Sequence, residues 1–250
     1  MEPKRAKVLT PAKFRHLLRV TEATSRFPER DALILLLGVT CGMRVTEIAR
    51  IEIRDVLTKS GARREEVSLR GSITKGCRPR CVYLAHERTI AAFDCYIEWR
   101  YRRGAGAALD RREYRGLMPH TRLILTQKGS AFELSVKRRV NFVGETVEYL
   151  AADSLQSYVT GLYRAAGLGA GHSSHSGRRT FARATRSTPC SCCSAIRIWT
   201  MSRLILKCPH ASDVKLWPLS MTNSIDGPSE RGSLCTEVCV RAADIAGQGD

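Results

Sequence analysis

The spacing of apolar residues over the first fifty positions predicts three helices. Thr10 can cap a first helix and Pro11 suits its first turn. Apolar residues then recur on one face, at positions 14, 17, 18 and 20. A second helix is expected over residues 30–39, where four leucines would be buried, and Cys41-Gly42-Met43 breaks it. Thr46 is expected to cap a third, short helix that runs to Ile51.

The hydrophobic period then changes from helical to alternating over residues 66–84. Two alternating segments flank the turn Thr74-Lys75-Gly76, which predicts a β-hairpin with a basic tip. Further on, a helix is expected over 86–103, a strand over 123–125, and helical segments over 135–166 that end at Gly167. The fold class expected is therefore mainly α with a small antiparallel β-sheet (α+β).

Charge narrows the range of partners. The chain of 250 residues has a net charge of +17 and a pI near 9.9. This balance favours a polyanion, most simply nucleic acid, although a basic protein without a polyanion ligand is an open alternative. No apolar run is long enough for a membrane span, and the first residues lack the apolar segment of a secretory signal. A cytoplasmic protein with mostly reduced cysteines is expected.

Composition divides the chain near residue 184. Residues 1–183 hold 34 basic and 18 acidic residues, whereas 184–250 hold 7 and 6. Six of the ten cysteines fall in the second part, and no Phe or Tyr does. We therefore expect residues 1–183 to form one domain and residues 184–250 to be an atypical tail without a well-specified fold.

Three separated motifs could bind phosphate. His175 and Arg178 stand three residues apart at the start of a predicted helix, Arg44 follows the break after the second helix, and Lys75 lies in the hairpin turn. The stretch 41–48 resembles the first arginine box of the tyrosine recombinases, the phage integrase family. Thr74-Lys75-Gly76 resembles that family's β-turn lysine, and 175–181 resembles its second box, His-x-x-Arg. The resemblance covers roughly residues 8–183.

The resemblance implies both a catalytic-domain fold and a chemistry that uses no metal and no cofactor. In this family a tyrosine attacks a DNA phosphodiester and forms a 3′-phosphotyrosyl bond. Arg44 and Arg178 would hold the non-bridging oxygens, because a guanidinium presents a planar fork of donors. Lys75 would protonate the leaving 5′-oxygen, and His175 would bond the phosphate or help to move the nucleophile's proton.

The resemblance also implies partners, which are double-stranded DNA and other recombinase protomers. Glu47 would orient nearby groups, or would only support a helix start. The residues expected to contact DNA are basic and lie in or beside the three motifs: Arg44, Lys75, Arg78, Arg80, Arg178 and Arg179.

Simpler interpretations of each motif remain open. Arg44 could be a solvated arginine at a helix end, Lys75 a surface turn residue, and His175 with Arg178 a capping pattern. The helix after Thr46 could belong to a helix-turn-helix, although no partner helix stands at the right spacing. Cys190-Ser191-Cys192-Cys193 with Cys208-Pro209-His210 matches no zinc signature, so no metal site is expected.

The chain departs from the family pattern after the second box. All seven tyrosines lie at or before Tyr163, so no nucleophile follows Arg178. When residues 193–208 are back-translated and read one nucleotide earlier, an allowed choice of codons gives LLGHPDLDHVAPYLEM. That string resembles the family's third box, with its histidine and tyrosine nine residues apart. We hypothesise that the C-terminal part is frame-shifted from shortly after Phe181, and that the domain is incomplete there.

A second departure lies at the N-terminus. Family members usually carry a helical core-binding domain before the catalytic domain, and here only about eight residues precede the first predicted helix. In the family that domain closes a clamp around DNA. DNA affinity is then expected to depend on one half of this clamp, and to weaken steeply with salt.

Overall fold

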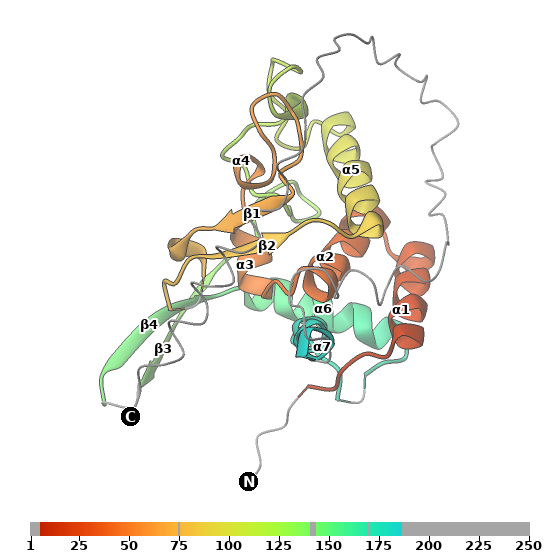
Figure 1. The fold of residues 1–250 in the computed structure, drawn as a ribbon, viewed down its shortest axis with the longest axis vertical. Coiled ribbons are helices and arrows are strands. Elements are labelled where there is room, and N and C mark those ends of the chain that lie inside the picture. The colour runs from red at the N-terminus through yellow and green to blue at the C-terminus, as the bar shows by residue number, and fades with distance from the viewer. Residues whose placement is uncertain (1–5, 75, 141–143, 170, 187–250) are drawn as a thin grey trace, which may run out of the picture. The chain divides into compact units, whose positions relative to one another are not determined.

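The computed structural model describes residues 6–74, 76–140, 144–169 and 171–186 (Figure 1). All of them belong to one unit of the chain, Met1–Cys208. Lys75 and the tail 187–250 lie outside the described residues. Helices dominate the described part, together with two small antiparallel sheets, so the expected fold class is confirmed.

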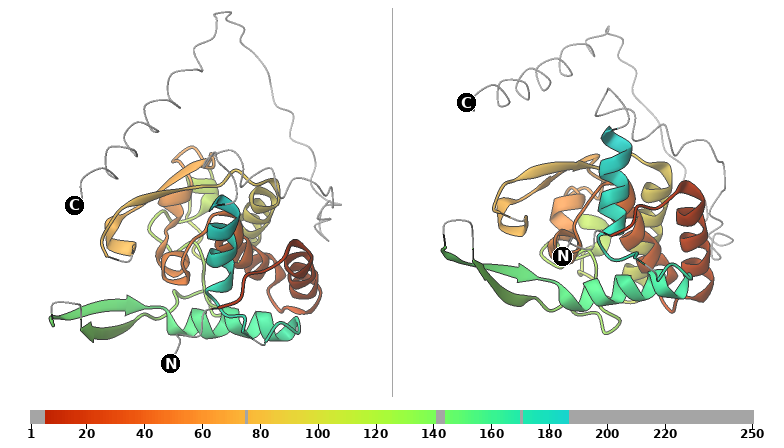
Figure 2. Two further views of the ribbon diagram at one scale, coloured as in Figure 1. Left: turned by 60° about the horizontal axis from the view of Figure 1, so that its bottom comes forward. Right: turned by 90° about the horizontal axis from the view of Figure 1, so that it is seen from below.

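Helix α2 (Pro28–Thr40) lies at the centre of the core. It is apolar nearly all round, and Leu33 to Leu37 are all buried, as expected for a helix enclosed by others. It contacts α1 (Pro11–Thr24), α3 (Val45–Arg50), α5 (Glu87–Arg102) and α7 (Ser176–Arg186), and Figures 1 and 2 show these helices arranged around it.

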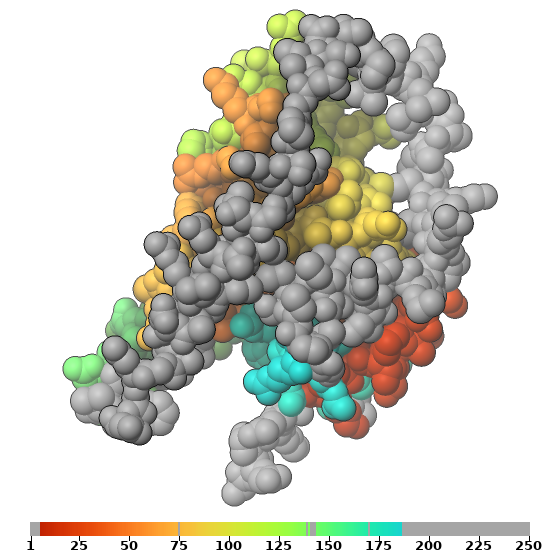
Figure 3. Space-filling model, in the orientation of Figure 1, coloured from red at the N-terminus to blue at the C-terminus, as the bar shows by residue number. Residues whose placement is uncertain are grey.

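The start of α1 follows the sequence prediction. The Thr10 hydroxyl accepts a hydrogen bond from the Lys13 amide at 3.3 Å, and Pro11 occupies the first turn. Just before it, the Leu9 amide donates to the Thr180 hydroxyl at 2.9 Å. The N-terminal region and α7, the two ends of the described chain, therefore meet, and Figure 3 shows them in red and cyan.

The first predicted hairpin is confirmed. Strands β1 (Glu66–Leu69) and β2 (Arg80–Tyr83) pair antiparallel, with Glu66 opposite Tyr83 and Leu69 opposite Arg80. The short helix α4 (Ile53–Val56) precedes the hairpin, and the 3₁₀ turn η1 (Gly71–Ile73) follows β1. A second 3₁₀ turn, η2 (Tyr114–Gly116), follows α5.

The helical prediction for residues 135–151 is wrong. This stretch forms a second hairpin, β3 (Ser135–Val140) with β4 (Thr146–Ala151), and only α6 (Asp153–Ala165) is helical in that region. Val136 and Val140 stand four residues apart, a spacing that a helix also gives. The segment is nevertheless rich in β-branched residues, which favour a strand.

The strand predicted at 123–125 is also wrong, because this stretch forms only isolated backbone bridges, Arg122 with Glu52 and Leu125 with Ala131. The buried Arg100 guanidinium donates to the carbonyls of Arg122 at 2.7 Å and Leu123 at 3.0 Å. The Leu125 amide donates to the hydroxyl of Tyr96 at 3.2 Å. Side chains of α5 therefore satisfy further backbone groups beside these bridges, and no continuous ladder forms.

The predicted cap of the third helix is misplaced by two residues. Helix α3 begins at Val45, so Arg44 occupies the N-cap position and Thr46 lies within the first turn. Glu47 takes over the capping, because its Oε2 accepts the Arg44 amide at 2.8 Å. The arginine is thus fixed at the exact point where the chain enters the helix.

Helix α7 is held close to α2 by small residues. A Cβ added at Gly177 would lie 3.1 Å from the carbonyl carbon of Gly38, so the two helices approach at backbone contact. Gly42, in the turn after α2, has φ +61°, and a Cβ there would lie 2.8 Å from Cγ of Phe181 on α7. The position of α7 against α2 therefore depends on glycine at these points.

We expect Gly42→Ala to destabilise the protein more than Gly129→Ala. Both glycines have positive φ, but a Cβ at Gly129 meets nothing within 4 Å, whereas one at Gly42 clashes with Phe181. The clash should add about 1–3 kcal/mol to the backbone strain that both variants share. Urea unfolding of the two variants measures the difference, and equal losses would contradict the predicted contact.

Candidate functional site

The turn between α2 and α3 forms the base of the candidate site. Gly42 turns the chain in the left-handed conformation, and the Met43 amide bonds back to the Leu37 carbonyl at 3.1 Å. Arg44 follows at once at the N-cap of α3, with one third of its side chain exposed. The Gly42 carbonyl and the Arg44 side chain are therefore neighbours on one short loop.

Glu47 is buried beneath Arg44. Its side chain has no exposed surface, and its Oε1 accepts a hydrogen bond from Arg44 Nη1 at 2.8 Å while Oε2 accepts the Arg44 amide. A buried carboxylate is stable only when it is paired and hydrogen-bonded. Glu47 meets that condition through both the backbone and the side chain of one residue, and through a second arginine.

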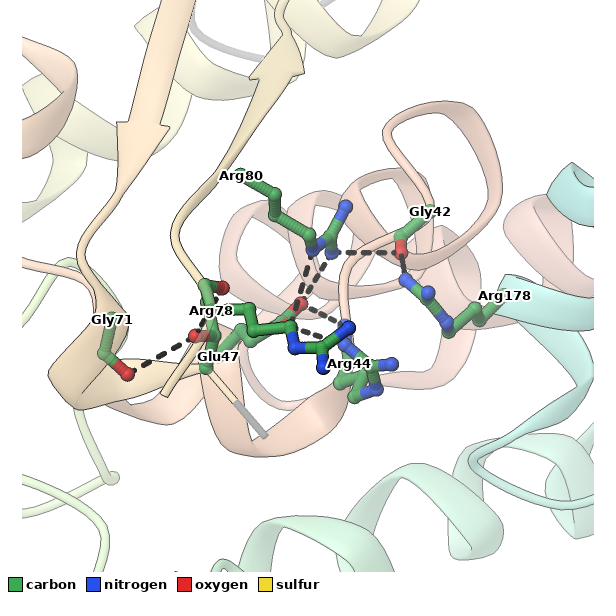
Figure 4. Close-up of polar contacts among 8 residues, drawn as sticks. Gly42, Arg44, Glu47, Gly71, Arg78, Arg80 and Arg178 are labelled. Atoms are coloured by element: carbon green, nitrogen blue, oxygen red, sulfur yellow. Dashed lines mark hydrogen bonds and ion pairs between the residues drawn. The ribbon is translucent and has the colours of Figure 1, made fainter. Parts of the chain in front are cut away.

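The second arginine is Arg80, at the start of β2. Its Nη2 lies 2.5 Å from Glu47 Oε2, and its Nε donates to Oε1 at 3.3 Å. The same Nη2 also donates to the Gly42 carbonyl at 3.2 Å. Figure 4 shows Arg80 reaching from its strand to both acceptors.

Arg178 completes the cluster from α7. Its Nη1 donates to the same Gly42 carbonyl that Arg80 uses. Three arginines from three elements, separated by up to 134 positions in the sequence, thus converge on two acceptors (Figure 4). We name Arg44, Arg80 and Arg178, together with Glu47, the arginine cluster.

The electrostatics of the cluster favour an anion. Burial alone would raise the pKa of Glu47, but hydrogen bonds from Arg80 and Arg44 outweigh it, and the pKa is lowered. Burial, with repulsion from Arg44 and Arg80, lowers the pKa of Arg178. One carboxylate faces three guanidiniums, so the cluster carries an excess of two positive charges.

The other predicted site residues lie outside this network. His175 is exposed just before α7, and its carbonyl accepts the Arg179 amide at 3.1 Å. The Arg179 guanidinium donates to the Ala6 carbonyl, which ties the N-terminal segment to α7. Arg78 is exposed on the segment that leads into β2. Lys75 lies outside the described residues.

Sequence reasoning missed two features of the site. Arg80 is predicted only as a DNA contact, although its guanidinium is bonded to Glu47 and Gly42. Gly42 is predicted only as a helix break, although its carbonyl joins Arg80 to Arg178. A carbonyl carries no signal in sequence, and no pattern links positions 42, 80 and 178.

Within the ranges that the structure describes, no three His, Cys, Asp or Glu side chains gather as metal ligands would. No described helix has both the length and the apolar character required to cross a membrane. The Cys190 and Cys208 segments lie outside the described residues.

Comparison with known proteins finds similarity at the level of solved structures. No family model matches the chain, and no curated protein matches it. XerA recombinase is similar at 17% identity, with 71% of this chain and 50% of that one covered and a TM-score of 0.45. A lambda integrase dimer bound to a COC′ core site is similar at 14% identity, with 89% of this chain and 64% of that one covered and a TM-score of 0.49.

A third similar structure is the Tn1549 transposon integrase in complex with circular intermediate DNA. It gives 19% identity and a TM-score of 0.46, with 82% of this chain and 59% of that one covered. The chain spans about half of the length of such solved structures. Similarity this distant does not identify a family or an activity for this chain.

We expect Glu47→Gln to remove a pH-dependent part of the stability. Because the folded pKa of Glu47 is lowered, its stabilisation is present above the ordinary value of 4.5 and is lost as the pH falls through the folded pKa. At pH 7 the variant should lose about 2 kcal/mol, since two arginines lose a charged acceptor. The gap between wild type and variant should narrow toward pH 3 in urea unfolding.

The matched control is Glu98→Gln, which removes an exposed ion pair with Arg102 on α5. That variant should change stability by less than about 0.5 kcal/mol. A Glu47→Gln loss that is equally small, or that does not depend on pH, would contradict the role assigned to the buried carboxylate.

Proposed function

We propose that this chain binds double-stranded DNA through the arginine cluster, and that residues 1–183 derive from the catalytic domain of a tyrosine-type site-specific recombinase or integrase. The observation that supports this is the position of Arg44 and Arg178, from the two boxes that resemble that family. Arg44 bonds to the Glu47 carboxylate and Arg178 to the nearby Gly42 carbonyl. The net charge of +17 supports the same class of partner. Other protomers of the same class are proposed as further partners.

The arrangement suits a phosphodiester. Arg44 and Arg178 each use Nη1 within the protein and are each only partly buried, which leaves their remaining N–H groups for the non-bridging oxygens of a phosphate. In a strand-transfer reaction these oxygens gain negative charge, and fixed donors stabilise that charge. By resemblance, Lys75 would protonate the leaving 5′-oxygen, and His175 would assist at the phosphate.

We propose further that this chain performs no strand cleavage. No tyrosine follows Arg178, and a phosphotyrosyl bond cannot form without the hydroxyl that attacks the phosphorus. The tail 184–250 is interpreted as a frame-shifted remnant of the third box.

A non-catalytic role is the second candidate function. The missing tyrosine favours it directly, because a chain that binds recombination sites without cutting them could modulate an intact recombinase. Both candidates require phosphate binding by the same arginines, and they differ only in whether a covalent adduct ever forms.

We expect Arg44→Ala and Arg178→Ala each to weaken duplex binding by about tenfold, because each removes a charge-assisted contact to phosphate. Fluorescence anisotropy with a labelled 30-base-pair duplex, repeated over a range of salt, measures this. Each substitution should also reduce the slope of log affinity against log salt by about one.

The matched control for these variants is Arg102→Ala, which removes one exposed positive charge from α5. Its affinity should stay within about twofold of wild type, since one distant charge is largely screened. Wild-type protein that fails to bind the duplex at low salt would contradict the proposed function.

We expect no covalent protein–DNA adduct from this chain on nicked duplexes, analysed by denaturing gel.

A variant with LLGHPDLDHVAPYLEM in place of residues 193–208 tests the frame hypothesis. Any adduct that this variant forms should vanish when the tyrosine of that segment is replaced by phenylalanine. The gene's nucleotides provide an independent check. An adduct from the unaltered chain, or a preceding frame without Leu-Gly-His and tyrosine codons, would overturn these expectations.

A further inference from the structure

Arg80 is the one arginine of the cluster that bonds to both shared acceptors. Glu47 accepts from Arg44 and from Arg80, and the Gly42 carbonyl accepts from Arg80 and from Arg178. Arg80 therefore links the two other arginines, which have no acceptor in common among the described residues.

The donors of Arg80 are mostly used inside the protein. Its Nε and Nη2 make three hydrogen bonds to Glu47 and Gly42, and its side chain is only 27% exposed. Arg44 and Arg178, by contrast, each give one side-chain nitrogen to these acceptors. The geometry leaves Arg44 and Arg178 available to an anion and commits Arg80 to the protein.

The reason for this division lies in the geometry of the carboxylate. An unopposed carboxylate binds a guanidinium best through two parallel hydrogen bonds. Glu47 Oε2 accepts Arg80 Nη2 at 2.5 Å and the Arg44 amide at 2.8 Å, and the Arg44 side chain bonds only to Oε1. With Arg80 absent, Arg44 would be the one arginine side chain still bonded to Glu47 among the described residues.

We infer that Arg80 is a positioning residue that keeps Arg44 and Arg178 free to bind phosphate, rather than a DNA contact itself. It occupies Glu47, and so prevents the buried carboxylate from drawing the Arg44 guanidinium inward. It also holds the Gly42 carbonyl on which Arg178 rests. This inference rests on the proposed function, because the anion it concerns is the DNA phosphate.

A double-mutant cycle between Arg80 and Glu47 tests this role. Arg80→Ala should weaken binding of the labelled 30-base-pair duplex by about tenfold, because Glu47 then draws Arg44 away from the phosphate. Glu47→Gln combined with Arg80→Ala should restore most of the affinity, because a neutral amide no longer draws Arg44 inward. The two substitutions should therefore be strongly non-additive.

A direct phosphate contact by Arg80 gives a different result. The effects of the two substitutions would then multiply without any rescue, because Glu47→Gln cannot replace a lost contact to phosphate. That outcome would overturn the inference while leaving the proposed function intact. If Arg80→Ala does not unfold cooperatively, Arg80→Gln replaces it. The glutamine side chain carries no charge but can still donate a hydrogen bond to Glu47 or to the Gly42 carbonyl.

A readout without DNA separates this inference from the proposed function. Modification of Arg44 by phenylglyoxal, followed by mass spectrometry, reports how free its guanidinium is. The rate should fall several-fold in Arg80→Ala, and should recover in the double variant. An unchanged rate of Arg44 modification in Arg80→Ala would overturn the inference. If the modification rates are as expected but the protein binds no duplex, only the proposed function is overturned.

Discussion

The described part of the molecule depends on one buried carboxylate. Glu47 has no exposed side-chain surface, yet it remains ionised because two arginines and a backbone amide compensate for its lost hydration. These bonds join the turn after α2, the first turn of α3 and the start of β2. A neutral residue of the same size could fill that space, but it would leave Arg80 without the charged acceptor that fixes its direction.

The second constraint is steric and acts on Arg178. An arginine on α7 reaches the Gly42 carbonyl only if α7 lies at backbone contact with α2, and Gly38 with Gly177 permits that approach. Gly42 in turn admits the ring of Phe181. The glycines therefore set the distance between α2 and α7, and the Gly42 carbonyl sets the direction of the Arg178 guanidinium.

The sequence predicted those parts of the fold that depend on local pattern. The Thr10-Pro11 entry, the buried leucines of α2 and the β1–β2 hairpin all follow from spacing and capping chemistry. It failed at 123–125, where only isolated bridges form and where Arg100 and Tyr96 bond to backbone groups beside them, because such partners are remote in sequence. For the candidate site it singled out Arg44, Arg178 and Arg80, but the Gly42 carbonyl that joins two of them could not be foreseen.

Binding and chemistry are separable in this architecture. The cluster that would grip a phosphate is built entirely from residues 42–178, and every bond that orients it is made within that range. Under the proposed function, loss of a nucleophile from a later segment would remove the attacking oxygen but none of these bonds. A domain altered after Phe181 would then keep its affinity for a phosphate backbone, since that affinity would depend on preorganised charge rather than on the reacting hydroxyl.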